Sequence, residues 1–113
     1  MSPVVVIDVA HPPRAPEVVE DELLQAWTSV RNSPSLRVIK VIHGYGSTGK
    51  GGSTRENVRN WAFRNRRHFR AVLNGEDYTL FNNEVQQMRL QVGQYPDPDL
   101  QFGNPGITVL WVK

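Results

Sequence analysis

Residues 36–52 read LRVIKVIHGYGSTGKGG and decide the fold, because a strand pattern gives way there to a glycine-rich segment. The first seven residues are apolar apart from Arg37 and Lys40, which is typical of a buried strand. Five glycines among the last ten residues exclude the interior of a strand or helix. Ser53 and Glu56 then form a capping box, which predicts that a helix begins at this point.

The residues before this stretch predict a strand followed by a helix. Residues 4–7 are a β-branched run that ends at Asp8 and Val9, and Pro12 and Pro13 stop the strand. From Pro16 to Val30, apolar residues recur at helical spacing, and acidic residues crowd the first turns, where the helix dipole favours them. A strand–helix–strand unit with short links normally places its two strands parallel, with a right-handed crossover.

The residues after the glycine segment predict two helices and two strands. The buried arc of the first helix is expected to hold Val58, Trp61, Ala62, Asn65 and Phe69. Residues 68–73 predict a short strand, residues 80–90 a helix and residues 107–112 a final apolar strand. The chain is therefore expected to form an α/β fold, a two-layer α/β sandwich with a mixed sheet of about four strands in the order βαβαβ…β. Its 113 residues fit one domain, residues 1–113.

The composition excludes several classes of protein. There is no cysteine, so a disulfide framework, a cysteine nucleophile and a cysteine-based zinc site are excluded. No apolar run is long enough to span a membrane. The formal net charge of +2 hides a basic middle, because residues 31–70 hold ten Lys and Arg against one Glu. Such a segment favours either a local phosphate-binding face or a solvated helix face.

Three phosphate-binding patterns compete with a simple flexible connection for the glycine segment. The spacing of Gly44, Gly46 and Gly49 matches the dinucleotide-binding pattern, but that fold needs a larger sheet. The stretch up to Lys50 is nearly a P-loop, but Gly51 stands where a Ser or Thr should hold magnesium. Binding of a nucleic-acid backbone uses the loop amides, the helix start and the arginines that follow, and we favour this interpretation.

The arginines of the expected helix form a stripe on a helical wheel. Arg55, Arg59, Arg66 and Arg70 fall within roughly 60° of one another. Phe63 lies at the edge of the stripe, where its ring either stacks on a base or packs on a neighbouring loop. Replacing Arg55 and Arg59 by alanine is expected to lower the salt slope of nucleic-acid binding by roughly two units.

Three polar side chains follow the two parallel strands. Asp8 and His11 lie at the carboxyl end of the first strand, and His43 lies at the carboxyl end of the second. Because these ends share one edge of the sheet, all three side chains are expected to converge there. An imidazole oriented by Asp8 could act as general base toward a water or a ribose 2′-OH. Structural roles stay open as well, with Asp8 capping a turn and His43 hydrogen-bonding its own loop.

Four stretches, in order, carry a family resemblance: residues 6–9 (VIDV), 41–51 (VIHGYGSTGKG), 54–61 (TRENVRNW) and 103–109 (GNPGITV). Together they span nearly the whole chain, from residue 6 to residue 109, and resemble the Smr (small MutS-related) domain family. The resemblance implies a compact fold similar to the carboxyl-terminal domain of translation initiation factor 3. It also implies nucleic-acid binding, and DNA-nicking or RNA-cleaving endonuclease activity with Asp8, His11 and His43 as catalytic residues. The residues expected to contact phosphate are Gly44, Gly46, Thr48, Gly49, Lys50, Gly51, Arg55 and Arg59.

The chain departs from the family pattern Leu-Asp-x-His-Gly. Ala10 stands where the histidine is expected, and His11 lies one position later. A shift by one position changes the direction in which a side chain points at a strand end, so this departure favours an alternative function. In that alternative the chain is a non-catalytic module that docks on a protein or ribosomal partner.

The resemblance also sets the expected partners and surroundings. The partners are DNA or RNA, with a ribosome or a MutS-like protein as further options, and no membrane; the expected location is cytoplasmic. No cofactor is expected, and a divalent metal stays an option although no ligand cluster is visible. The segment at about residues 77–103 is longer than the usual link between the last two strands, and it offers a partner surface or a lid.

Overall fold

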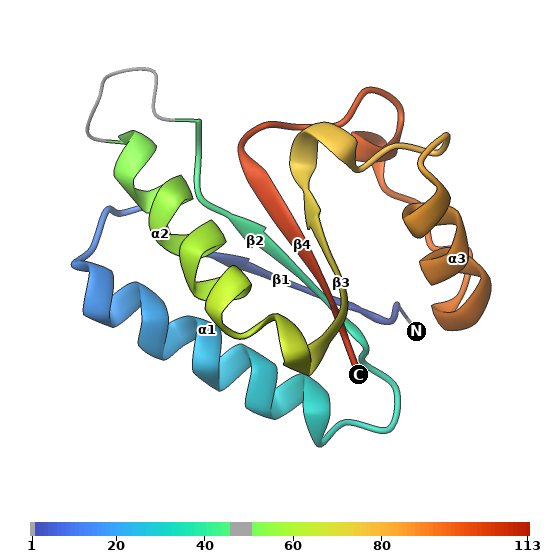
Figure 1. The fold of residues 1–113 in the computed structure, drawn as a ribbon, viewed down its shortest axis with the longest axis horizontal. Coiled ribbons are helices and arrows are strands. Elements are labelled where there is room, and N and C mark those ends of the chain that lie inside the picture. The colour runs from blue at the N-terminus through green and yellow to red at the C-terminus, as the bar shows by residue number, and fades with distance from the viewer. Residues whose placement is uncertain (1, 46–50) are drawn as a thin grey trace.

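The computed structural model describes residues 2–45 and 51–113, which form a mixed four-stranded sheet with three α-helices (Figure 1). The strands β1 (Val4–Asp8), β2 (Val38–Ile42), β4 (Ile107–Val112) and β3 (Phe69–Asn74) lie side by side in that order. β1 and β2 are parallel, and β4 runs antiparallel to both β2 and β3. The α/β fold class, the mixed sheet and the parallel first pair are therefore as predicted.

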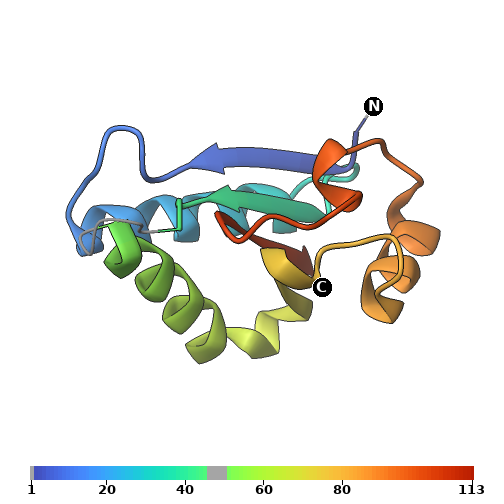
Figure 2. The same cartoon turned by 90° about the horizontal axis from the view of Figure 1, so that it is seen from above.

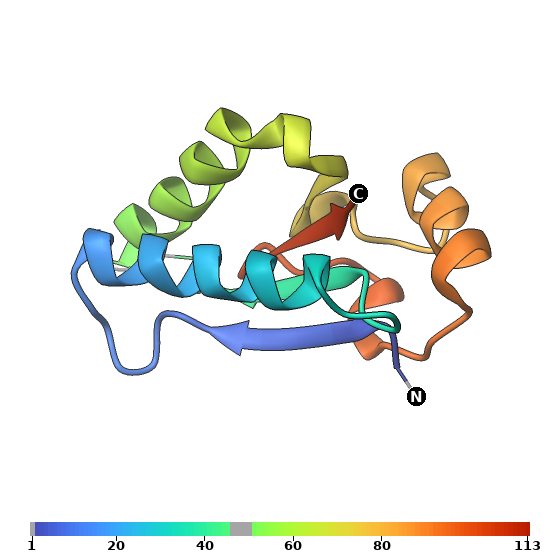
Figure 3. The same cartoon turned by 90° about the horizontal axis from the view of Figure 1, so that it is seen from below.

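One face of the sheet is covered by α1 (Pro16–Arg31) and α2 (Gly51–Arg64). The buried stripe of α1 consists of Val19, Leu23, Ala26 and Val30, as its spacing predicts. It packs in one cluster with Ile39, Val41 and Leu110 from the sheet. Figure 3 shows α1 running back alongside β1, the arrangement of a strand–helix–strand crossover.

The other face of the sheet is covered by the segment between β3 and β4. This segment contains α3 (Asn83–Val92) and two short 3₁₀ turns, η2 (Gly75–Asp77) and η3 (Pro98–Leu100). Val85 and Met88 of α3 pack with Trp111, whose neighbour Leu110 faces the first cluster. Because side chains alternate between faces along a strand, the two clusters lie on opposite faces. Figure 2 shows α3 standing apart from α1 and α2.

The helix expected after the glycine segment differs from the prediction at both ends. α2 begins at Gly51, before the Ser53 that the capping box indicates, and it ends at Arg64. A 3₁₀ turn, η1 (Arg66–His68), follows, and Phe69 already belongs to β3. The predicted arginine stripe is therefore wrong beyond α2, because Arg66 lies in the turn and Arg70 in the strand.

The end of α2 has a local physical cause. The side-chain amide of Asn65 donates to the carbonyl of Trp61 at 2.8 Å, and the His68 amide donates to the Asn65 carbonyl at 2.9 Å. These bonds close a turn and deliver Phe69 to the sheet, where it pairs with Val112. Phe69 is buried as predicted, but as a strand residue.

Candidate functional site

The carboxyl ends of β1 and β2 lie together at one edge of the sheet. Asp8 pairs with Ile42 in the parallel register, and the Val9 amide donates to the Ile42 carbonyl at 3.0 Å. The side chains of Asp8 and His11 therefore follow β1 at the same edge where His43 follows β2, as predicted.

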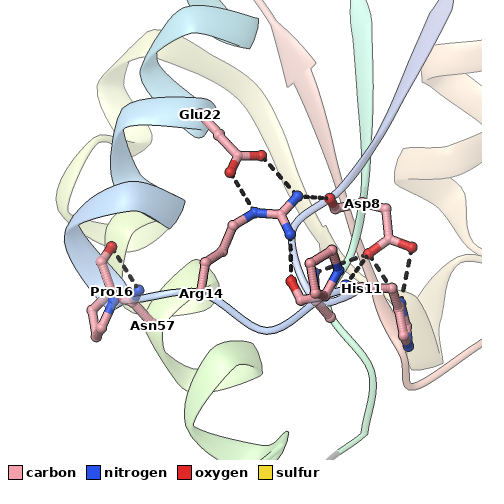
Figure 4. Close-up of polar contacts among 8 residues, drawn as sticks. Asp8, His11, Arg14, Pro16, Glu22 and Asn57 are labelled. Carbon is pink, nitrogen blue, oxygen red and sulfur yellow. Dashed lines mark hydrogen bonds and ion pairs between the residues drawn. The ribbon is translucent and has the colours of Figure 1, made fainter.

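Asp8 and His11 form a close pair (Figure 4). Asp8 Oδ1 accepts hydrogen bonds from the amides of Ala10 (2.9 Å) and His11 (3.0 Å), and His11 Nδ1 lies 2.9 Å from Asp8 Oδ2. Partial burial raises the pKa of Asp8, but the bonds from the Ala10 amide and from His11 outweigh it and lower that pKa below its ordinary value. The His11 side chain is 71% exposed, so its ring contacts the Asp8 carboxylate through Nδ1 while the rest of the ring faces solvent. The turn closed by Asp8 thus brings His11 to the carboxylate, although His11 lies one position later in the sequence than the pattern Leu-Asp-x-His-Gly requires.

Arg14 holds this turn in shape and is a residue that the sequence reasoning missed. Its guanidinium donates to the backbone carbonyls of Asp8 (2.7 Å) and Pro12 and pairs with the Glu22 carboxylate (Figure 4). The signal in the sequence is charge, because Arg14 is the only Lys or Arg among the first 30 residues. Arg14 positions the backbone that presents Asp8 and His11.

His43 lies in a different environment. Its side chain is buried, with 1% of the residue exposed. Nδ1 is 2.8 Å from the Gly44 carbonyl, which can only accept, so Nδ1 carries the proton and Nε2 accepts from the Thr108 hydroxyl at 2.9 Å. Burial lowers the pKa of His43, and Arg59 and Arg55 lower it further, against a smaller raising effect of the Gly44 carbonyl. None of the hydrogen bonds among the described residues joins His43 to Asp8 or His11, and the two ring nitrogens of His43 bond to Gly44 and Thr108 instead.

Arg59 continues the chain of hydrogen bonds from His43. Its Nε donates to Thr108 Oγ1 at 3.0 Å, and its terminal nitrogens donate to the Ile107 carbonyl (3.2 Å) and to Glu76 (2.6 Å). The bond from Arg59 lowers the pKa of Glu76. Arg59 therefore ties α2 to β4 and η2. This engagement makes it less available to a phosphate than the sequence suggested.

The other predicted phosphate contacts are placed only in part. Gly46, Thr48, Gly49 and Lys50 lie outside the described residues. Gly44 takes a φ of +76°, a left-handed conformation that favours glycine, and Gly51 is the first residue of α2. Arg55 is partly buried in the second turn of α2, and its charge is felt by both His43 and Glu76.

The first turns of α2 lie next to the turn that carries His11. Asn57 donates to the Pro16 carbonyl at 3.3 Å (Figure 4), and a small hollow is lined jointly by Arg14, Pro16 and Thr54. The amino end of the helix and the Asp8–His11 pair therefore belong to one edge of the molecule.

Phe63 does not offer a bare ring to a base. Its side chain is exposed, and the Arg66 guanidinium lies over the ring at 4.1 Å from the centroid. This cation–π contact covers one face of the ring.

An open cleft of about 390 Å³ lies at the same edge, on the face of the sheet away from α1 and α2. Its lining includes His11, Lys40, Gly44, Tyr45, Asp99 and Asn104. Tyr45, Asp99 and Asn104 are further residues that the sequence reasoning did not single out, because the last two come from the segment between β3 and β4.

The described residues offer no group of three or more His, Asp or Glu side chains that could hold a metal ion. Among residues 2–45 and 51–113, no helix has the length and apolar character needed to cross a bilayer.

A search of solved structures finds that the chain is similar to the Smr domain of Thermus thermophilus MutS2. The TM-score is 0.55 at 17% sequence identity, and the match covers 97% of this chain and 96% of that chain. A scan against protein-family models gives no match, and a search of curated proteins gives none either. The structural match shows that the chain has an Smr-like fold along nearly its whole length, as the four sequence stretches imply.

Proposed function

We propose that this chain binds nucleic acid at the carboxyl edge of β1 and β2 and cleaves a phosphodiester bond there. The observation that carries the proposal is the Asp8–His11 pair, an exposed imidazole held at 2.9 Å by a carboxylate on the rim of a cleft. An Asp–His pair of this kind orients a general base, because the carboxylate accepts the Nδ1 proton and leaves Nε2 to take one. The Smr-like fold supports the same proposal.

The proposed reaction uses few groups. His11 Nε2 removes a proton from a water or a ribose 2′-OH, and that oxygen forms a bond to phosphorus while the bond to the leaving oxygen breaks. The leaving oxygen takes up a proton from solvent or from the imidazolium. Asp8 remains ionised throughout, because its hydrogen bonds lower its pKa, and it stabilises the positive charge on His11.

Phosphate binding in this proposal comes from the start of α2. The first backbone amides of a helix have no partner within the helix, and the helix dipole makes this end positive. Gly51, at this end, and Arg55, in the next turn, are the described candidates for contact with the backbone phosphates. Gly46, Thr48, Gly49 and Lys50 stay candidates on the strength of the sequence alone.

A cleavage assay tests the chemistry. His11→Ala and Asp8→Asn are expected to lower the cleavage rate by roughly 10²- to 10⁴-fold, the usual contribution of a positioned acid–base group. His68→Ala is the matched control, because His68 packs against Trp27 away from this edge. Cleavage that survives both substitutions would remove Asp8 and His11 from the proposed mechanism.

A second candidate function rests on a separate observation. Phe81 and Phe102 are 88% and 89% exposed, and both belong to the segment between β3 and β4. Exposed aromatic side chains are enriched where proteins bind one another. In this alternative the chain is a non-catalytic module that docks on a protein or ribosomal partner, and the wild-type chain cleaves neither DNA nor RNA under any metal condition.

A further inference from the structure

The cleft next to His11 also contains an aromatic ring. Tyr45 lines it and is 58% exposed, although its backbone follows directly from a buried strand and a buried histidine. An exposed ring beside a candidate general base is the kind of feature on which a nucleobase stacks.

The position of the Tyr45 ring is set by backbone geometry. The amides of His43 and Gly44 both donate to the Gly106 carbonyl, at 2.9 and 3.0 Å. Gly44 takes a left-handed φ, and the next residue, Tyr45, lines the cleft. A Cβ atom on Gly106 would lie 3.1 Å from both Cδ1 and Cε1 of Tyr45, so the ring packs against a position where glycine leaves it room. Tyr45 is therefore held in place on one side and open on the other.

The charges around the cleft argue against a phosphate as its occupant. Lys40 pairs with both Asp97 (2.9 Å) and Asp99 (2.6 Å), so this group of three carries a net charge of −1. The His11 ring already faces the Asp8 carboxylate. Among the described residues that line the cleft, no cation is left to balance a further anion against these carboxylates, whereas a neutral group needs none.

The polar groups of the cleft suit a neutral, planar ligand. Asn104 Oδ1 accepts from the Gly106 amide at 2.8 Å, and Asn104 Nδ2 donates to Asp99 Oδ1 at 3.2 Å. These two bonds fix the orientation of the amide and still leave it one N–H and one lone pair. An amide with both a donor and an acceptor to spare matches the edge of a base. The volume of about 390 Å³ is within the range of small-molecule sites.

We propose that this cleft holds one unpaired nucleobase, stacked on Tyr45, of the strand whose phosphodiester lies at Asp8–His11. This inference rests on the proposed function and adds a substrate class, namely single-stranded segments, loops or ends. A base inside a continuous duplex is paired and stacked between its neighbours, and it must leave both before it can enter the cleft.

The test compares two strands that differ only in their bases. Binding of the 113-residue chain is measured by fluorescence anisotropy with a single-stranded oligonucleotide and with an abasic strand of the same length. The wild type is expected to bind the intact strand roughly 5- to 150-fold more tightly, the usual range for base stacking on an aromatic side chain. Tyr45→Ala is expected to remove this difference, and Tyr45→Phe to retain it. Phe81→Ala is the control, an exposed aromatic outside the cleft lining.

The possible failures are distinguishable. Equal binding of intact and abasic strands by the wild type overturns the base site and leaves the proposed backbone binding standing. A preference for the intact strand that survives in Tyr45→Ala also overturns it. Binding of neither strand overturns the proposed function, and the base site with it.

Discussion

Two histidines that follow neighbouring parallel strands have opposite environments in this molecule. His11 follows β1, is 71% exposed and faces one carboxylate, whereas His43 follows β2, is buried and uses both ring nitrogens within the fold. The two histidines differ in burial because the strands before them have different neighbours in the sheet. β1 is an edge strand, while β2 lies beside β4, whose Thr108 reaches His43 under the cover of α2. A shared sheet edge therefore brings residues near one another without giving them the same role.

The strongest test of this difference is a substitution of the buried histidine. His43→Ala removes the partner of the Thr108 hydroxyl and leaves a hollow beneath α2. We expect the free energy of unfolding to fall by about 2–4 kcal/mol. Denaturant unfolding of the variant measures this loss. His11→Ala, the matched control on the exposed histidine, should change the same free energy by no more than about 0.5 kcal/mol. Equal losses for both would contradict the division of roles.

Thr108→Val tests the hydrogen bonds that join His43, Thr108 and Arg59, because valine keeps the shape of the threonine side chain. Valine takes away the acceptor of Arg59 Nε and the donor to His43 Nε2. We expect a loss of about 1–3 kcal/mol in the free energy of unfolding, because the buried His43 ring and the partly buried Arg59 guanidinium each lose a partner. Thermal and denaturant unfolding report it. A neutral result would mean that water or relaxation replaces both bonds.

The pH dependence of stability sharpens the comparison. The pKa of His43 is lowered from its ordinary value of 6.5, so the unfolded chain binds a proton there that the folded chain resists. Stability from this residue is fully present above pH 6.5 and is lost as the pH falls below it. His43→Gln cannot titrate and is expected to lose less stability between pH 7.5 and 5.5 than the wild type. If the melting temperature falls equally in both proteins between pH 7.5 and 5.5, His43 is not the cause of the loss of stability.

Two carboxylates act in the same direction at lower pH. The pKa values of Glu76 and Asp8 are both lowered, from ordinary values of 4.5 and 3.8. Their contributions are present above those values and disappear as the pH falls through the folded pKa of each group. As the pH is lowered, the free energy of unfolding is therefore expected to fall first through protonation of His43 and then, at lower pH, through protonation of Glu76 and Asp8.

The smallest expected effect concerns Arg55 in the proposed binding of nucleic acid. Arg55→Ala should lower the slope of log affinity against log salt by about one unit, the effect of one lost phosphate contact. Arg31→Ala makes the same change of charge at the far end of α1 and should leave the slope unchanged. An equal drop for Arg31 would move the contact surface away from the start of α2.

The order of elements could be predicted from local patterns, but the ends of α2 could not. The β-branched runs, the spacing in α1 and the turn at Pro12 and Pro13 are signals within a few residues, and the fold follows them. Asn65 lies on the apolar arc of the wheel, so the pattern continues through it. Its bond to the Trp61 carbonyl, which helps to end α2, is visible only in three dimensions.

The candidate site also has one part that local sequence can predict and one part that it cannot. Asp8 and His11 are three residues apart, and a turn closed by an aspartate is a local event that a sequence can suggest. The role of His43 depends on Thr108, which is 65 residues away, and on Arg59 from another element. No periodicity or spacing carries that information, so the bonds that join His43, Thr108 and Arg59 could not be predicted before the fold was known.

The most direct test of the division between the two histidines is the NMR spectrum of their rings, recorded with and without a single-stranded oligonucleotide. Signals are assigned with His11→Ala, His43→Gln and His68→Ala. We predict that His43 shows the tautomer protonated on Nδ1, protected from solvent and unmoved by the oligonucleotide, while the His11 signals shift. Shifts at His43 with none at His11 would contradict this account.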